Sequence, residues 1–193
     1  MAERKYVTIV SGLPRSGTSM MMRMITEGGL PALVDNLRAA DEDNPKGYFE
    51  FEPVKKTKKD ASWVKDGVGK VVKMVHLILL DMPLEYEYRV VFMRRNLHEV
   101  LKSQDKMLVR SGKNTDDMPK ERLMEIYRVQ IHKVQHHMKQ HPDRFKFIEV
   151  DYNETMKNPA PSAERISAFL DGLDPDKMCA LVDPTLYRNR AAT

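Results

Sequence analysis

Short apolar runs rich in β-branched residues alternate along the chain with longer segments in which apolar residues recur at helical spacing. The runs predict strands over residues 5–11, 70–75, 88–93 and 145–150. The periodic segments predict helices over residues 18–27, 54–65, 97–110, 119–140 and 162–170. Strands that alternate with helices predict an α/β fold, in three layers, with a parallel sheet flanked by helices on both faces. No repeat or Pro/Gly-rich linker divides the sequence, so we expect one domain over 1–193.

The segment 119–140 has the pattern of a long amphipathic helix. Pro119 suits its first turn, with Asp116 or Asp117 as the N-cap. An apolar stripe then follows the helix through Leu123, Tyr127, Ile131, Val134 and Met138. We expect this stripe to pack against the sheet.

The composition is that of a globular protein. Of the 193 residues 41% are hydrophobic and 31% charged, and no apolar run approaches the roughly 18–20 residues of a membrane span. The first strand begins almost at the N-terminus and leaves no room for a signal peptide, so we expect a cytoplasmic protein that binds no membrane. The net charge of +4 suits an anionic ligand without demanding nucleic acid. The single cysteine, Cys179, excludes an internal disulfide, and its apolar neighbours predict a buried, inert thiol.

The strongest local signal is the sequence Ser-Gly-Leu-Pro-Arg-Ser-Gly-Thr-Ser over residues 11–19, between the first strand and the first helix. Its two glycines allow a tight turn in which N–H groups converge on a phosphate, and the helix that follows adds its partial positive charge. The arginine adds a cation with a fork of donors. We therefore predict a phosphate-binding loop with the candidate contacts Pro14, Arg15, Ser16, Gly17, Thr18 and Ser19. The alternative is a glycine-bearing turn with no ligand.

The loop departs from the nucleoside-triphosphate motif at one position. That motif reads G-x-x-x-x-G-K-[ST]; Gly12 and Gly17 have its spacing, but Thr18 occupies the place of the lysine. Because that lysine reaches the β- and γ-phosphates of ATP or GTP, its absence argues against an ordinary kinase or NTPase. An atypical P-loop kinase or NTPase stays open as an alternative, and so does a non-catalytic nucleotide-binding module.

A second anion site is expected after the third strand. Arg95 stands at the end of that strand, and Ser103 follows eight positions later, two turns along the next helix. An arginine and a serine in this arrangement can bind one phosphate together. The alternative for Arg95 is a surface ion pair with Glu99. In a parallel sheet this site and the phosphate loop both lie beyond the carboxyl ends of strands, where ligands bind.

These segments resemble the PAPS-dependent sulfotransferases, and in particular their bacterial sulfotransferase-like branch. Residues 12–19 are similar to the 5′-phosphosulfate loop of that family, and the segment of Arg95 and Ser103 is similar to its 3′-phosphate block. The resemblance implies a P-loop-type sheet and 3′-phosphoadenosine 5′-phosphosulfate (PAPS) as co-substrate. It implies transfer of a sulfuryl group to a hydroxyl or amine of a small acceptor. It also implies that Arg15 contacts the phosphosulfate and stabilises the bridging oxygen as it leaves.

A third similar segment runs over residues 147–159. By this resemblance Tyr152 corresponds to a tyrosine near the adenine of the donor; the alternative is a tyrosine packed at a strand end. In the C-terminal Tyr-Arg-Asn-Arg segment, Arg188 corresponds loosely to the basic loop that closes over the 3′-phosphate, or else belongs to a frayed basic tail.

Transfer also needs a base for the acceptor proton, and two residues compete for that role. Glu50 ends an Asn-Pro-Lys-Gly-Tyr-Phe-Glu segment that resembles bacterial sulfotransferase-like proteins, and several branches use a glutamate there as base. Desolvation by its aromatic neighbours would raise the pKa of its carboxyl group. A carboxylate that holds an arginine or caps a helix is the alternative.

His76 is the rival base. The run from Lys73 to Leu80 resembles the Lys-Thr-His-Leu-Pro-Leu of cytosolic sulfotransferases, in which the histidine is the base and the lysine assists at the sulfuryl group. Lys73 matches that lysine. The histidine arrives one residue late, which reverses its face along a strand unless a bulge intervenes.

Two histidine pairs, His132/His136 and His137/His141, have the i, i+4 spacing of a metal site. The helix that carries them is otherwise polar and lacks further ligands, so we expect a solvated face and no metal. The chemistry transfers no γ-phosphate and does not require Mg²⁺. The expected partner is a small-molecule acceptor, and a homodimer is left open.

Overall fold

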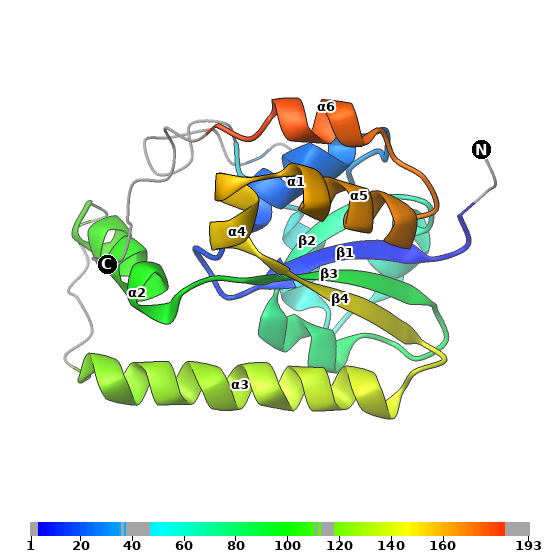
Figure 1. Cartoon of the computed structure of the whole chain (residues 1–193). Coiled ribbons are helices and arrows are strands. Elements are labelled where there is room, and N and C mark those ends of the chain that lie inside the picture. The colour runs from blue at the N-terminus through cyan, green and yellow to red at the C-terminus, as the bar shows by residue number, and fades with distance from the viewer. Residues whose placement is uncertain (1–3, 36, 38–46, 111, 113–117, 184–193) are drawn as a thin grey trace.

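The computed structural model describes residues 4–35, 37, 47–110, 112 and 118–183 (Figure 1). A sheet of four parallel strands, in the order β2-β1-β3-β4, forms its centre. The strands are β1 Val7–Gly12, β2 Val71–Val75, β3 Tyr88–Arg94 and β4 Phe145–Asp151. All four predicted strands are confirmed, each within two residues of its predicted ends.

Successive side chains of a strand point to opposite faces of the sheet, and here they enter two separate cores. Val7 and Ile9 of β1 belong to one core, together with Val134 of the long helix. Val10 belongs to the other core, with Ile25 of the first helix. Every residue of β1 is buried, which explains why most of them are apolar and why apolar and exposed polar positions do not alternate along it.

Helices cover both faces of this sheet. One side carries α1 Thr18–Glu27, α4 Tyr152–Lys157, α5 Ala160–Phe169 and α6 Pro175–Ala180. The other side carries α3 Lys120–Gln140 and the 3₁₀-helices η1 Glu52–Lys56, η2 Ser62–Gly67 and η3 His76–Asp81. Figure 1 shows the two groups, with α3 along one side of the sheet and α1, α5 and α6 on the opposite side. The prediction of a three-layer α/β fold is confirmed.

The strand order places the candidate site. From β1 the chain passes to β2 on one side, and it then crosses to β3 on the other side. Ligands of such sheets bind beyond the carboxyl ends of the strands, at the point where the chain changes direction. Gly12 at the end of β1 pairs with Met93 near the end of β3. The phosphate loop and the start of α2 Leu97–Arg110 therefore leave the sheet at neighbouring positions.

The single helix predicted over 54–65 is wrong. The segment forms the two short helices η1 and η2, and the burial of its apolar residues explains the break between them. Trp63 is buried, and its indole N–H donates to Thr57 Oγ1 at 3.1 Å, while the same hydroxyl donates to Val54 O at 2.6 Å. Anchoring the indole in the core breaks the segment into two turns, so tertiary packing overrides helix propensity here.

Several local expectations also change. Pro119 is the N-cap residue of α3 rather than part of its first turn, and Asp116 and Asp117 lie outside the described residues. Cys179 is half-buried, not fully buried, because its neighbour Met178 fills the core. The helices α4, α6 and η3 carry no clear periodicity over their six residues each, and the sequence did not predict them. Of the helices described, none has the length and apolar character needed to cross a membrane.

Candidate functional site

The predicted phosphate-binding loop, called the phosphate loop below, joins β1 to α1, with residues 13–17 between the two elements. Gly12 has a φ of +153°, and a Cβ at this position would lie 2.6 Å from Ser16 Oγ and 2.7 Å from Met93 O. Only glycine therefore allows the loop to lie so close to β3. Arg15 has a φ of 71°, in the left-handed region that residues other than glycine rarely adopt. Strain of this kind persists where surrounding contacts hold it, and it clusters at functional sites.

The N-terminus of α1 faces this loop without a side-chain cap from any described residue. Gly17 occupies the N-cap position with a φ of 95°, and the first turn contains no acidic residue. The first N–H groups of a helix lack partners within the helix and carry its partial positive charge. With Thr18 and Ser19 in the same turn, this end of α1 combines the donors that an anion requires.

Tyr152 packs directly against the loop. A Cβ on Gly17 would lie 2.3 Å from Tyr152 Cδ2, so the ring covers the glycine. The guanidinium of Arg95 lies over the same ring, 4.3 Å from its centroid, and Tyr152 is 6% exposed. The alternative of a tyrosine packed at a strand end thus describes what Tyr152 does in the structure, where it also joins the two predicted anion sites.

The two predicted anion sites lie side by side. Arg15 Nε donates to Ser103 Oγ at 3.0 Å, and Arg95 Nη1 donates to the carbonyl oxygen of Arg15 at 2.9 Å. Two arginines from different strand ends are thereby held next to the same turn.

Glu99 is the counter-charge of this arrangement. Its Oε2 accepts from Arg95 Nε at 3.1 Å and from Asn153 Nδ2 at 3.0 Å. The side chains of Arg95 and Glu99 are only 7% and 3% exposed, so the expected surface ion pair is a buried one. A buried charge pair needs further hydrogen bonds to offset desolvation, and Asn153 and the Arg15 carbonyl supply them.

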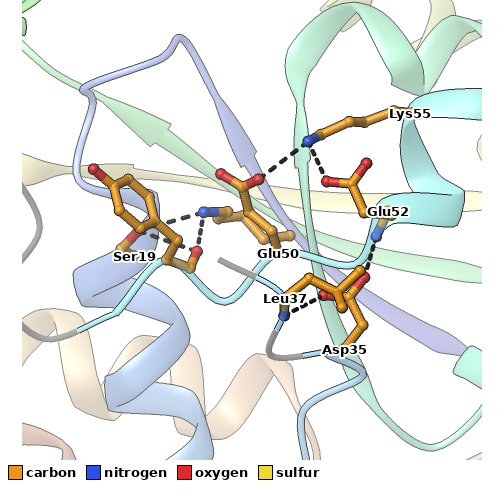
Figure 2. A network of polar contacts seen from close by, with 8 residues as sticks. Ser19, Asp35, Leu37, Glu50, Glu52 and Lys55 are labelled. Atoms are coloured by element: carbon orange, nitrogen blue, oxygen red, sulfur yellow. Dashed lines mark hydrogen bonds and ion pairs between the residues drawn. The ribbon is translucent and has the colours of Figure 1, made fainter. Parts of the chain in front are cut away.

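Lys73 brings a cation close to the first turn of α1. Its ammonium lies 3.4 Å from Ser19 Oγ and donates to the carbonyl oxygen of Tyr48, contacts drawn with dashed lines at Ser19 in Figure 2. It also lies 5.7 Å from the centroid of the Tyr48 ring. In nucleoside-triphosphate loops a lysine follows the last glycine, whereas here Thr18 stands in that place. Lys73 of β2 therefore supplies a positive charge at the N-terminus of α1, although the loop itself has no lysine after its last glycine.

Glu50 lies between Ser19 and Lys55 in the close-up of the polar contacts in Figure 2. Its carboxylate accepts from Lys55 Nζ at 3.2 Å, and its side chain is 18% exposed. The hydrogen bond of Lys55 to Glu52, together with Glu50, raises the pKa of the lysine. Asp35 accepts from the Glu52 N–H at 2.6 Å, which secures the segment that follows Glu50.

His76 is the first residue of η3 and is buried, with 3% exposure. Its Nε2 lies 3.0 Å from Gln130 Oε1 on α3. Burial lowers the pKa of its imidazole, and the hydrogen bond to Gln130 opposes that shift. Its Nδ1 is buried and has no hydrogen-bond partner among the described residues.

Some predicted residues stand apart from this site. Arg188 lies outside the described residues. The rings of His132 and His136 stack 6.3 Å apart on α3, and those of His137 and His141 lie 4.7 Å apart. Within the described ranges, no three His, Cys, Asp or Glu side chains are grouped so as to hold a metal ion.

Comparison with solved structures decides the fold. The chain is similar to the sulfotransferase domain of the curacin biosynthetic pathway, with 14% identity, a TM-score of 0.50, and coverage of 96% of this chain and 90% of that one. It is also similar to the sulfotransferase domain of the Synechococcus PCC 7002 olefin synthase, with 13% identity, a TM-score of 0.55, and coverage of 96% and 87%. The chain has the sulfotransferase fold. No family model and no curated protein sequence matches it.

On this sulfotransferase fold, the sequence motifs identified the charged residues near the loop. They did not identify the residues that position those side chains through hydrogen bonds. Asn153 and Gln130 were missed. Asn153 lies within the segment 147–159 but was given no role, and Gln130 belongs to no motif. Each acts through a hydrogen bond to a residue distant in sequence. Glu99 was named only as the surface partner of Arg95 in the alternative interpretation, and its burial was not predicted.

Proposed function

We propose that this protein is a PAPS-dependent sulfotransferase that transfers a sulfuryl group to a hydroxyl or amine of a small acceptor. The observation that carries the proposal is the junction of the two anion sites. Arg15 Nε lies 3.0 Å from Ser103 Oγ, and Arg95 Nη1 lies 2.9 Å from the Arg15 carbonyl oxygen. A nucleotide with phosphates at both its 5′ and 3′ positions is the ligand whose charge distribution matches two adjacent cationic sites.

The phosphate loop supports the 5′ end of this assignment. The hydroxyl of Ser16 is buried and has no hydrogen-bond partner in the described part of the chain. A buried polar group without a partner is unfavourable, and a bound oxyanion would offer one after rotation of the hydroxyl. The uncapped N-terminus of α1 and the ammonium of Lys73 add positive potential on the same side of the sheet.

The chemistry follows from these positions. The acceptor oxygen or nitrogen attacks the sulfur, a new bond to sulfur forms, and the bond from sulfur to the bridging oxygen breaks. The electron pair stays on that oxygen, which becomes part of the 5′-phosphate of adenosine 3′,5′-bisphosphate. Arg15 stabilises the charge that develops there, and Lys73 assists at the sulfuryl group. The acceptor proton passes to the base.

Glu50 is the first candidate for that base and His76 the second. The segment of Glu50 is tied to α1 and β2, because Lys73 binds the Tyr48 carbonyl and Ser19 hydroxyl. The ammonium of Lys55 lies 3.2 Å from the Glu50 carboxylate. His76 is neutral at neutral pH by virtue of its lowered pKa, but it lies buried against Gln130.

A binding titration separates this function from its alternatives. We expect adenosine 3′,5′-bisphosphate to raise the melting temperature, and ATP with Mg²⁺ to raise it less at equal concentration. Stabilisation by ATP with Mg²⁺ alone would reject the sulfotransferase assignment in favour of an atypical kinase or NTPase. Binding of PAPS without transfer of labelled sulfate across a broad panel of alcohols, phenols and amines would indicate a nucleotide-binding module.

The base is then identified by a pair of substitutions. Glu50→Gln should lower kcat by about 10²–10⁴-fold with little change in donor affinity, because it removes proton acceptance and keeps the shape of the side chain. His76→Asn serves as the comparison and should keep most of the wild-type kcat. The reverse pattern would assign the base to His76.

A further inference from the structure

One hydrogen-bonded relay reaches the phosphate loop from outside the predicted site. Gln104, on α2, donates from Nε2 to the carbonyl oxygen of Pro14 at 3.2 Å. Its Oε1 accepts from the hydroxyl of Tyr127, on α3, at 2.8 Å. A carbonyl oxygen can only accept, so the amide of Gln104 has one orientation that satisfies both contacts. The Pro14 carbonyl thereby fixes which end of the amide faces the loop, and the tyrosine hydroxyl donates to the other end.

A second contact holds the next carbonyl of the same loop. Arg95 Nη1 donates to the carbonyl oxygen of Arg15 at 2.9 Å. The peptide groups on either side of the Arg15 Cα are therefore both bound by side chains from the α2 region. Because each peptide group is planar, the directions of these two carbonyls set φ and ψ of Arg15. This is the residue that has the unfavourable φ of 71°.

We propose that Gln104 and Tyr127 are positioning residues that, together with the backbone contact of Arg95, hold Arg15 in its left-handed conformation. That conformation directs the Arg15 guanidinium toward Ser103 and fixes the direction of its backbone N–H. Such strain persists only where the surrounding structure over-determines it. The inference rests on the proposed function, in that the 5′-phosphate group of the donor is the ligand the loop receives.

The relay makes a prediction that a purely structural role does not. It acts on the phosphate loop, so its loss should weaken ligands that carry a 5′-phosphate and spare ligands that carry only a 3′-phosphate. Losing one hydrogen bond of this kind changes affinity by about three- to tenfold. Tyr127→Phe keeps the ring and removes only the hydroxyl, and it should give a smaller loss of about two- to threefold in the same direction.

The test measures binding by calorimetry for wild type, Gln104→Leu and Tyr127→Phe, each with 5′-AMP, 3′-AMP and adenosine 3′,5′-bisphosphate. Gln135→Leu is the matched control, since it removes a glutamine amide that binds Glu149 at the surface of α3. We expect both relay variants to bind 5′-AMP and the bisphosphate more weakly, to bind 3′-AMP within twofold of wild type, and to melt within a few degrees of it. The control should bind all three ligands as wild type does.

Three outcomes overturn the proposal. Wild-type affinity of either relay variant for 5′-AMP would remove that residue from the relay. An equal loss for 5′-AMP and 3′-AMP would indicate a general loosening of the site rather than an effect on the loop. If the wild-type protein itself bound none of the three nucleotides, the proposed function would fall, and the relay with it; the wild-type titration therefore distinguishes that failure from failure of the relay alone.

Discussion

The contact between Gly17 and Tyr152 gives a quantitative test of how the phosphate loop is built. Gly17→Ala would place a methyl group 2.3 Å from Tyr152 Cδ2, at a residue whose φ is +95°. A left-handed backbone at a non-glycine residue costs about 1–2 kcal/mol. Displacing a packed ring adds about 1–3 kcal/mol. Tyr152 cannot move freely, because it is 6% exposed and lies 4.3 Å below the Arg95 guanidinium. We therefore expect a loss of about 2–5 kcal/mol in the free energy of unfolding.

Gly172→Ala is a matched control for the backbone part of this cost. Gly172 has a φ of +88°, close to that of Gly17, but a Cβ there would have no atom within 4 Å. Its substitution should cost only the backbone part, about 1–2 kcal/mol. The free energies are measured by urea unfolding followed by circular dichroism. Losses that agree within about 0.5 kcal/mol between the two variants would refute the steric argument.

A double substitution separates the clash from any other effect at this site. Removal of the Tyr152 ring creates room for the new methyl group. In the Tyr152→Ala background, Gly17→Ala should therefore cost only its backbone part, about 1–2 kcal/mol, so the two changes are not additive. Additive losses would show that the ring does not limit the residue at position 17.

Three further predictions follow from the charges of the site. Arg15→Ala should lower the rate of sulfuryl transfer from labelled PAPS by about 10²–10³-fold or more, since it removes a donor to the leaving oxygen; a rate within tenfold of wild type would contradict this role. Glu99→Gln should lower the free energy of unfolding in urea by about 1–3 kcal/mol and weaken binding of adenosine 3′,5′-bisphosphate, because Arg95 loses its buried counter-charge; unchanged values for both would contradict it. Burial lowers the pKa of His76 and of His137 in the folded protein. As the pH falls below about 6.5, the unfolded chain therefore binds more protons than the folded one. The free energy of unfolding should fall as the pH drops from about 7.5 to 5.5. The His76→Gln variant should lose less stability over that range, and an equal loss in both proteins would show that His76 does not contribute.

A lysine from the sheet gives this phosphate loop a charge that its own sequence lacks. The position after Gly17 is a threonine, so Arg15 is the only cation within residues 11–19. In the folded chain Lys73 reaches the hydroxyl of Ser19 from the neighbouring strand β2. Two cations of different origin thus flank the loop, one rigid and able to form several hydrogen bonds, the other a compact point charge.

The fold class and the positions of the charged motifs could be predicted from the sequence alone. The strands and the helices α1 and α2 follow from the local pattern of apolar residues, because a buried parallel strand is rich in apolar residues and a surface helix is apolar on one face. The loop over residues 11–19 was recognisable because its glycines and hydroxyls are contiguous and their backbone requirements are local.

Which residues act together depends on how the helices and strands pack, and the sequence did not predict it. Glu99 is a buried counter-charge rather than a surface partner because α4 brings Asn153 over it. Tyr127 looked like a core residue of the α3 stripe, yet its hydroxyl reaches the phosphate loop through Gln104. Hydrogen bonds of this kind join groups that are far apart in sequence, and their geometry depends on how the elements pack. The spacing of residues along the chain therefore does not predict these hydrogen bonds.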